Sequence, residues 1–194
     1  AGVRPYERVP FGWSCHNERS TGAFEHSEFL ELTGNDPSLP CIEAMLSVID
    51  PSDDGAILVY SQAYEKTRLK ELAMRHPEYA PQLERYTERL VDLLPIVKEH
   101  FYHPDMRGSF SIKRVLPVVA PHLRYIDLDE IQEGTGAQIA YLQACIESSA
   151  TPERTADLRR KLLEYCELDT WAMVEVAYFL QNCGTPTRPT RIRD

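Results

Sequence analysis

The residues from Thr151 to Gln181 form the pattern that most constrains the fold, because they predict one long helix with a single apolar face. Thr151 is a good N-cap residue, and Pro152 and Glu153 suit the first turn of a helix. Large side chains then recur at steps of three and four residues, which places on one face Leu158, Leu162, Tyr165, Met173, Val176 and Leu180. We therefore expect this helix to bury one face against a core.

Asp169 falls in the middle of this apolar face, and Tyr165 precedes it by one turn. A carboxylate that faces a core must be paired, protonated or bound to a cation, because its burial without compensation is costly. A backbone amide or an arginine that satisfies Asp169 is one explanation. A cation held at this position is the other, and helix spacing leaves both open.

The rest of the chain alternates strand and helix patterns, which predicts an α/β domain over residues 1–183. Two runs with alternating apolar residues, Val9–Cys15 and Ala23–Leu30, flank a turn-rich stretch and predict an antiparallel hairpin. The continuous apolar run Ala56–Tyr60 follows a strong turn and predicts a strand buried on both faces. The remaining expected elements are helices over 39–49, 61–76 with Ser61 as N-cap, 81–89, 94–101, 112–119 and 137–147, a short strand over 90–94, and a disordered tail over 184–194.

Composition narrows the class of protein. The net charge of −9 argues against nucleic-acid binding by bulk charge alone, but it is compatible with an enzyme that carries acids in a metal site. No apolar run approaches the roughly 18 residues of a membrane span, and the start of the chain does not resemble a secretory signal. Five scattered cysteines without metal-finger spacing indicate free thiols in a reducing cytoplasm. His100 and His103 suit a surface turn around Pro104 better than a metal pair.

A second candidate acid, Glu65, follows the strand Ala56–Tyr60 and lies in the first turn of the next helix. Ligands of α/β sheets tend to bind beyond the carboxyl ends of strands, which is where Glu65 falls. An acid in a first turn also simply complements the helix dipole, so a structural role remains open.

Several motifs resemble those of the DEDD 3′–5′ exonucleases of the ribonuclease-H-like superfamily. Tyr165-Cys166-Glu167-Leu168-Asp169 resembles the Tyr-x-x-x-Asp third motif of the tyrosine subclass, and the segment from Leu58 to Leu69 resembles the second motif. Those enzymes usually have Asp where this chain has Glu65, and Asn where it has Ser61 or Gln62. The segments around Asp92 and Ser109 are similar to the strand and the helix start that come next.

A narrower resemblance links the chain to an uncharacterised prokaryotic domain family assigned to the same fold. It rests on the segments Pro5–Phe11, Glu65–Leu69 and His103–Ser109 and covers about residues 3–181. Members of that kind often carry a separate nuclease-like domain upstream, so the resemblance implies a longer parent protein that processes nucleic acid.

The resemblance implies a ribonuclease-H-like mixed sheet with flanking helices and a hydrolase that uses two metal ions. Carboxylates would hold Mg²⁺ or Mn²⁺, which activate water for attack on a phosphodiester. Asp169, Glu65 and Asp92 would serve as metal ligands, and Tyr165 would orient the attacking water. Lys66, Ser109 and Lys113 would contact DNA or RNA.

The first motif of the exonucleases, Asp-x-Glu on a central strand, has no counterpart in this sequence. The segment before Val9 contains one acid, Glu7, beside Pro5. We therefore expect this chain alone to be inactive. We also expect the missing central strand to leave the edges of its two neighbouring strands unpaired, unless another segment, a partner chain or an upstream extension fills the gap. A non-catalytic relative that binds nucleic acid or protein, and an unrelated α/β domain, remain the alternatives.

Overall fold

A computed structural model describes residues 10–123, 141–142, 151–182, 184 and 188–192. Strands β1 (Gly12–Glu18) and β2 (Ala23–Leu30) form an antiparallel hairpin in which Trp13 pairs with Phe29. The turn between them closes through the Gly22 N–H, which donates to Arg19 O, and Gly22 takes a φ of 76° that suits glycine. The predicted hairpin is confirmed, although β1 extends three residues beyond Cys15.

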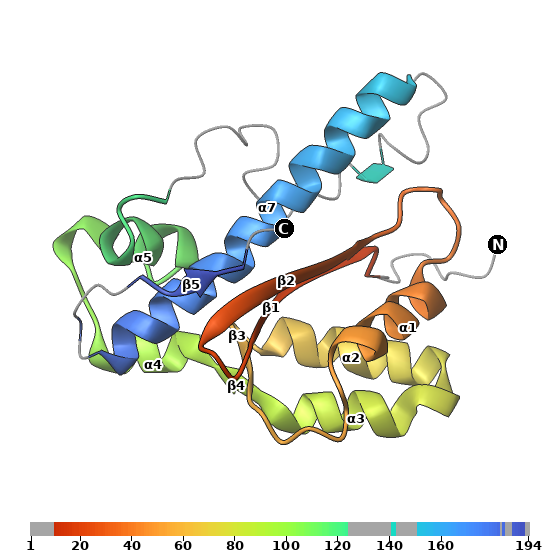
Figure 1. Cartoon of the computed structure of the whole chain (residues 1–194), viewed down its shortest axis with the longest axis horizontal. Coiled ribbons are helices and arrows are strands. Elements are labelled where there is room, and N and C mark those ends of the chain that lie inside the picture. Colours follow the sequence, from red (N-terminus) through yellow and green to blue (C-terminus); the bar gives the residue numbers. More distant parts are fainter. Residues whose placement is uncertain (1–9, 124–140, 143–150, 183, 185–187, 193–194) are drawn as a thin grey trace.

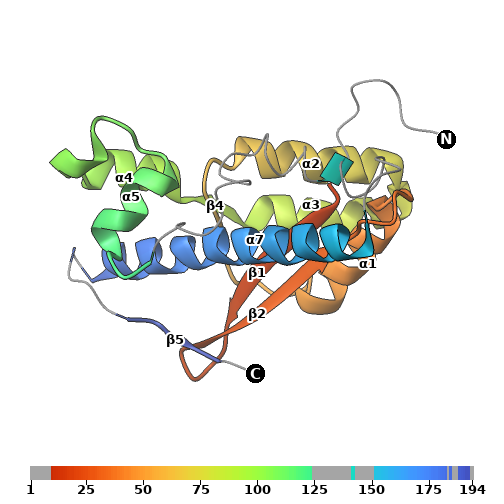
Figure 2. The ribbon, with the colours of Figure 1, turned by 90° about the horizontal axis from the view of Figure 1, so that it is seen from above.

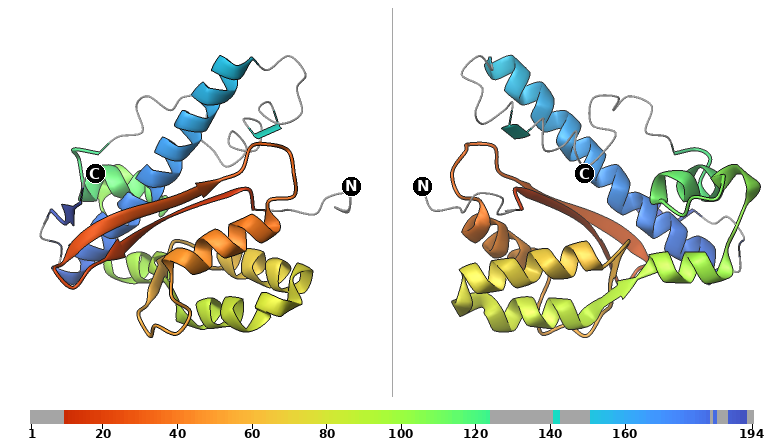
Figure 3. Two further views of the ribbon diagram at one scale, coloured as in Figure 1. Left: turned by 45° about the vertical axis from the view of Figure 1, so that its right-hand side comes forward. Right: turned by 180° about the vertical axis from the view of Figure 1, so that it is seen from behind.

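Three helices cover one face of the hairpin. They are α1 (Ser38–Val48), α2 (Ala63–Arg75) and α3 (Ala80–Arg89), with a 3₁₀ turn, η1 (Pro77–Tyr79), between the last two. Figure 1 shows them beneath the hairpin, and both views in Figure 3 show the same layer. Their apolar sides form a core with the hairpin residues Trp13 and Phe29, built on Cys41, Ile42, Leu69, Leu72, Leu83 and Tyr86.

A second, smaller sheet joins β3 (Ile57–Val59) and β4 (Leu90–Asp92) in parallel. Both strands were predicted. The expectation that the first is buried on both faces is wrong, because Leu58 is 38% exposed and Val91 is 39% exposed while Val59 is buried. Two short strands present one covered face only, since no layer of described residues packs over the side that carries Leu58 and Val91.

The long helix α7 (Pro152–Gln181) lies on the opposite face of the hairpin from α1, α2 and α3 (Figure 2). Its predicted start is confirmed, because Thr151 Oγ1 accepts a hydrogen bond from the Arg154 N–H at 3.2 Å. Of the predicted apolar face, Leu158, Leu162, Tyr165 and Val176 are buried, whereas Asp169, Met173 and Leu180 are partly exposed. The C-terminal half of α7 is buried on more than one side, since it also buries Trp171, Ala172, Val174, Glu175, Ala177 and Phe179.

The second neighbour of α7 is a small helical unit. It contains α4 (Leu93–His100), the 3₁₀ turn η2 (Pro104–Met106) and α5 (Ile112–Val119), and it was predicted closely. Its core joins α7 through Val97, Met106, Val115, Val119, Val176 and Phe179. The helix expected over 137–147 lies almost entirely outside the described residues.

The tail was expected to be disordered throughout, and this is wrong for part of it. Thr190–Arg191 forms a short strand, β5, that pairs in parallel with β2, and the Ile192 N–H donates to Phe24 O at 2.8 Å. The sheet order is therefore β1-β2-β5 in one sheet and β3-β4 in the other. The domain is mixed α/β with a small mixed sheet between helical layers, and no described helix has an apolar stretch suited to crossing a bilayer.

Candidate functional site

A groove of about 1870 Å³ lies between β1 and β3. Every residue of β1 and of β3 lines it, and side chains of α1, α2 and α7 complete its walls. Its apolar lining includes Trp13, Cys41, Met45, Ile49, Leu69, Leu72, Tyr86, Leu162, Met173 and Val174. The groove therefore lies between the two sheets, where a single continuous sheet would have another strand.

The outer edge of β1 faces this groove, and no strand of the described part of the chain pairs with it. The Arg19 N–H donates to Ala23 O and the Glu31 N–H donates to Phe11 O, which fixes the alternation of the hairpin hydrogen bonds. Odd-numbered residues of β1 consequently bond to β2, while the N–H and C=O of Ser14 and His16 point away from it. Among the described residues no strand pairs with this edge, nor with the edge of β3 that β4 leaves open.

Glu65, the candidate acid of α2, lines the groove and is half-buried. Its Oε2 atom is buried without a hydrogen-bond partner. Burial raises the pKa of this carboxyl, hydrogen bonding to its own backbone opposes the rise, and the nearby Asp92 carboxylate adds to it. A buried carboxylate oxygen without a hydrogen-bond partner is costly to ionise, and a bound cation would stabilise its negative charge.

Asp92 has a structural role that its sequence context did not reveal. Its Oδ1 accepts from the N–H of Ser61 at 2.8 Å and of Leu94 at 3.0 Å, and its Oδ2 accepts from the Gln62 N–H at 3.0 Å. Burial acts to raise the pKa of Asp92, but these backbone hydrogen bonds and Lys98 lower it below its usual range. The carboxylate thus fastens the end of β3 and the start of α2 to β4, and it does not line the groove.

The same contacts correct the predicted start of α2. Ser61 was expected to be its N-cap, but Ser61 takes a φ of 74°, Gln62 precedes the helix, and neither side chain caps it. A positive φ at a non-glycine residue is unfavourable, and the Asp92 carboxylate compensates by binding the amides on both sides of this bend.

Tyr165 and Asp169 form a second polar group at the groove, and Lys113 lies beside Tyr165. The Tyr165 hydroxyl donates a hydrogen bond to the Asp169 carboxylate, and burial followed by this acid raises the pKa of Tyr165. The Lys113 ammonium of α5 lies 5.0 Å from the centre of the Tyr165 ring. Tyr165, Asp169 and Glu65 all line the same groove, so α2 and α7 present their candidate residues to one space.

Two of the other predicted contacts lie elsewhere. Lys66 and Ser109 are not part of the groove lining, and the Ser109 hydroxyl accepts instead from the Ser111 N–H at 3.4 Å. His103, which was assigned to a surface turn, indeed caps η2 by accepting from the Asp105 N–H at 3.3 Å.

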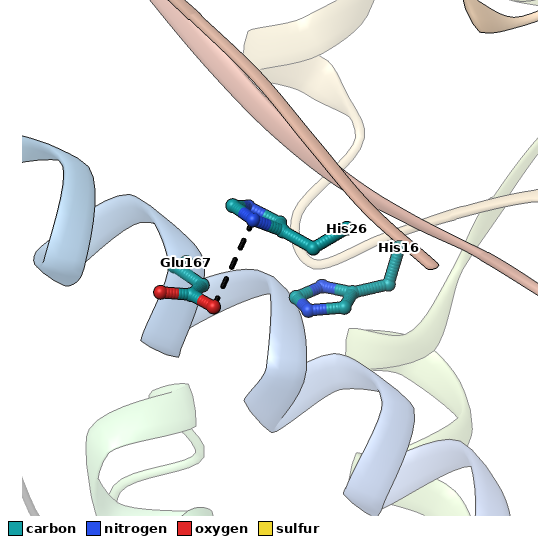
Figure 4. A group of neighbouring side chains, drawn as sticks. All are labelled: His16, His26 and Glu167. Atoms are coloured by element: carbon teal, nitrogen blue, oxygen red, sulfur yellow. Dashed lines mark ion pairs between the residues drawn. The ribbon is translucent and has the colours of Figure 1, made fainter. Parts of the chain in front are cut away.

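One cluster was missed by the sequence reasoning altogether. Within the described ranges, the group of three side chains whose ligand atoms all lie within 4.8 Å of one another is His16, His26 and Glu167 (Figure 4). Glu65, Asp92 and Asp169 do not form such a group. The sequence held a signal for the two histidines. In the hairpin, residues at equal distances before and after Thr21 pair with each other, so His16 lies opposite His26.

Comparison with known proteins identifies the family. A family model described as "Domain of unknown function (DUF2779)" matches residues 1–111, which is more than half of the chain. The chain belongs to this family. The matched part of the DUF2779 domain contains Glu65 and Asp92 but ends before α7, so it does not contain Tyr165 or Asp169.

Curated relatives of this DUF2779 protein include proteins of Mycoplasma and Ureaplasma. It is 26% identical over 168 residues to "Uncharacterized protein MG366 homolog" of Mycoplasma pneumoniae, a match that covers 76% of this chain and 24% of the relative. It is 24% identical over 156 residues to "Uncharacterized protein UU173" of Ureaplasma parvum, which covers 72% of this chain and 22% of the relative. The chain thus spans about a quarter of the length of these relatives. No solved structure matches it.

Proposed function

We propose that this DUF2779 chain is part of a metal-dependent nuclease domain of the DEDD 3′–5′ exonuclease type, with a ribonuclease-H-like fold that the chain alone does not complete. The observation that carries the proposal is that Glu65 from α2 and the Tyr165–Asp169 pair from α7 line one groove, with a buried and unpartnered carboxylate oxygen on Glu65. Oxygen ligands of this kind favour Mg²⁺ or Mn²⁺.

The candidate residues in and beside the groove have roles that suit phosphodiester hydrolysis. Glu65 and Asp169 would hold divalent ions, whose chemistry is to activate water and to stabilise the charge on a leaving oxygen. The Tyr165 hydroxyl, fixed by Asp169 and too weakly acidic to ionise near neutral pH, would orient a water molecule. Lys113, which lies beside the Tyr165 ring, would contact a phosphate. Asp92 supports Glu65 by fastening the start of its helix and is not a ligand in this proposal.

Two acids are too few for a site that binds two ions, and the groove suggests where the others come from. Its walls carry the open edges of β1 and β3, and buried backbone groups of this kind require hydrogen-bond partners. We propose that a strand outside the described residues fills the groove, joins the two sheets and brings the remaining carboxylates to Glu65 and Asp169.

The test is Mn²⁺-dependent degradation of end-labelled single-stranded DNA and RNA by the chain extended upstream into its parent protein. Stepwise shortening from the 3′ end is expected, and the chain alone is expected to leave both substrates intact. Asp169→Asn should abolish degradation by the extended protein. The matched control is Glu164→Gln, an exposed acid of the same helix that pairs with Arg160, and this variant should retain full activity. An extended protein whose activity survives Asp169→Asn would contradict the proposal.

A non-catalytic relative that binds a strand of another protein is the second candidate function. The feature that favours it is the same pair of open strand edges beside the apolar residues of the groove. An extended segment of a partner protein can bind to such an edge as an added strand. It predicts that the extended protein folds, gains stability and never degrades nucleic acid with any divalent ion.

A further inference from the structure

The cluster of His16, His26 and Glu167 lies where the hairpin meets α7, on the face of β1 and β2 that carries alternate side chains toward that helix (Figure 4). The His26 Nδ1 atom is 3.7 Å from Glu167 Oε1, and the two imidazole rings are 4.8 Å apart between centres. The His16 Nε2 atom is buried without a hydrogen-bond partner. These donors come from three elements and converge on one small volume.

Hydrogen bonds behind the two imidazoles decide which ring nitrogens carry protons. The Thr170 hydroxyl donates to helix carbonyls, those of Cys166 at 3.2 Å and Glu167 at 3.1 Å. It must therefore accept from both of its other partners, the Ser14 hydroxyl at 2.9 Å and His16 Nδ1 at 3.0 Å.

The same reasoning extends to His26. Because the Ser14 hydroxyl donates to Thr170, it accepts from His26 Nε2 at 2.9 Å. His16 is thus protonated on Nδ1 and His26 on Nε2. The lone pairs that remain are on His16 Nε2 and on His26 Nδ1, the atom that faces Glu167.

The ring nitrogens that carry these lone pairs and the Glu167 carboxylate lie close together, since the ligand atoms of the three side chains are all within 4.8 Å of one another. Two lone pairs and a carboxylate that face one another repel unless a cation lies among them. The cation present is the guanidinium of Arg191, which pairs with Glu167 and lies over the Trp171 ring.

We propose that His16, His26 and Glu167 form a binding site for a transition-metal ion of the Zn²⁺ type, and that Arg191 of β5 occupies the cation position when the metal is absent. Two imidazole nitrogens and a carboxylate oxygen are a common ligand set for Zn²⁺. In a tetrahedral site with bonds of about 2.1 Å, ligand atoms lie roughly 3.4 Å apart. The 3.7 Å between His26 Nδ1 and Glu167 Oε1 is close to this value, and the ligand atoms of all three side chains lie within 4.8 Å of one another.

The network behind the ligands is typical of a metal site. Metal-binding histidines usually donate their second N–H to a neighbouring acceptor, which fixes ring orientation and leaves the correct nitrogen free. Thr170 and Ser14 do this for His16 and His26. They are positioning residues, and they connect the site rigidly to the backbone of α7.

Metal binding and the Arg191 pair exclude each other. Glu167 Oε1 is the atom that contacts both Arg191 and His26, so a metal that takes this oxygen displaces the guanidinium. β5 has two residues in register with β2, and Arg191 is one of them. Occupancy of the site is thus coupled to the docking of β5. The site does not depend on the proposed nuclease activity, because its ligands differ from Glu65 and Asp169.

The experiment is Co²⁺ binding to the whole chain, followed by visible absorption, with competition by Zn²⁺ measured calorimetrically. We expect saturable one-to-one binding with the spectrum of nitrogen and oxygen ligands. His26→Asn and Glu167→Gln should each weaken binding by at least about tenfold, and Thr170→Val by about tenfold. Arg191→Met should tighten binding about fivefold, because it removes the competing cation without removing a ligand.

The matched control is His76→Asn, a histidine of the far helical layer that pairs with Glu78 and should leave Co²⁺ affinity unchanged. Circular dichroism checks that each variant is folded, and Arg191→Met tests the proposal even where loss of a histidine prevents folding. The proposal is overturned if Arg191→Met leaves the Co²⁺ affinity unchanged. It is also overturned if a thiolate charge-transfer band assigns the metal to a cysteine, or if neither the wild-type chain nor Arg191→Met binds Co²⁺ saturably.

Discussion

The Asp92 carboxylate accepts hydrogen bonds from three backbone amides, so it stabilises the junction of β3, β4, α2 and α4. Asp92→Ala should lower the free energy of unfolding by about 2 kcal/mol, since amides of a bend and a helix start lose their acceptor. Asp92→Asn should cost about half as much, because one oxygen remains. Urea unfolding at pH 7 measures both, with the exposed acid of α4 in Glu99→Gln as the control, which should change stability little.

The pH dependence of the same variants follows from the lowered pKa of Asp92. A depressed pKa in the folded state stabilises the fold above the unfolded-state pKa of about 3.9, and this contribution is lost as the pH falls through the folded-state value. The stability gap between the wild-type chain and Asp92→Asn should therefore narrow below about pH 4. A gap that stays constant would show that the charge of Asp92 is not what the amides require.

Glu65 should behave in the opposite way. Its pKa is raised chiefly by burial, so the ionised form destabilises the fold at pH values above the unfolded-state pKa of about 4.3. Glu65→Gln should raise the free energy of unfolding at pH 7.5 by a few tenths to about 1 kcal/mol, a range reduced for partial solvent exposure, and the gain should vanish below about pH 4.

Mn²⁺ should reverse the order of stability, because the carboxylate then gains a partner that glutamine cannot replace. Thermal unfolding with and without Mn²⁺ measures this, and Glu84→Gln on the exposed side of α3 is the matched control. Destabilisation by Glu65→Gln in the absence of metal would mean that the Glu65 carboxylate already has a partner that stabilises its charge.

At the level of elements, α5 and α7 approach each other across small side chains. Ala120 and Ala172 are buried with Leu116 where the two helices meet. Ala172→Leu should destabilise the domain by about 1–3 kcal/mol, because a well-packed contact cannot take the extra methylenes without moving a helix. Ala156→Leu at an exposed position of the same helix is the control and should be nearly neutral. Thermal unfolding compares them, and equal stability of the two variants would contradict close packing at Ala172.

Local patterns predicted the individual elements well, and the reason is that each is specified within a short stretch of chain. The hairpin, the parallel pair β3 and β4, and helices α1 to α5 and α7 all fall near their expected bounds. The cap of α2 could not be predicted, because its acceptor is Asp92, about thirty residues away in the chain. The strand β5 was missed for a similar reason, since Thr190–Arg191 has no strand pattern of its own and forms through pairing with β2.

Across the whole molecule, the fold brings some of the candidate site residues together and leaves others apart. The sequence placed Glu65, Tyr165 and Asp169 at element positions that the fold brings to one groove, and Lys113 beside Tyr165. The structure binds Asp92 to backbone amides and leaves Lys66 and Ser109 outside the groove lining, because which acid faces a groove and which binds backbone depends on packing between distant elements. The roles assigned to these residues stay predictions. The approach of Glu167 to His16 and His26 likewise depends on where α7 crosses the hairpin, which no local pattern specifies.

The open edge of β1 makes a prediction that concerns the assembly of the domain. In the chain alone, hydrogen exchange should alternate along β1, with slow amides at Trp13, Cys15 and Asn17, which bond to β2, and fast amides at Ser14 and His16, which face the groove. In the chain extended upstream, a strand that fills the groove should protect Ser14 and His16 as well, because it supplies the acceptors that these amides lack.

Amide-resolved exchange by NMR measures both states, and the paired amides of β2 serve as the internal reference. Protection of all β1 amides in the chain alone would mean that residues outside the described part already cover this edge. Alternation that persists in the extended protein would mean that no strand enters the groove, and the two sheets would then function as separate units with the candidate acids exposed between them.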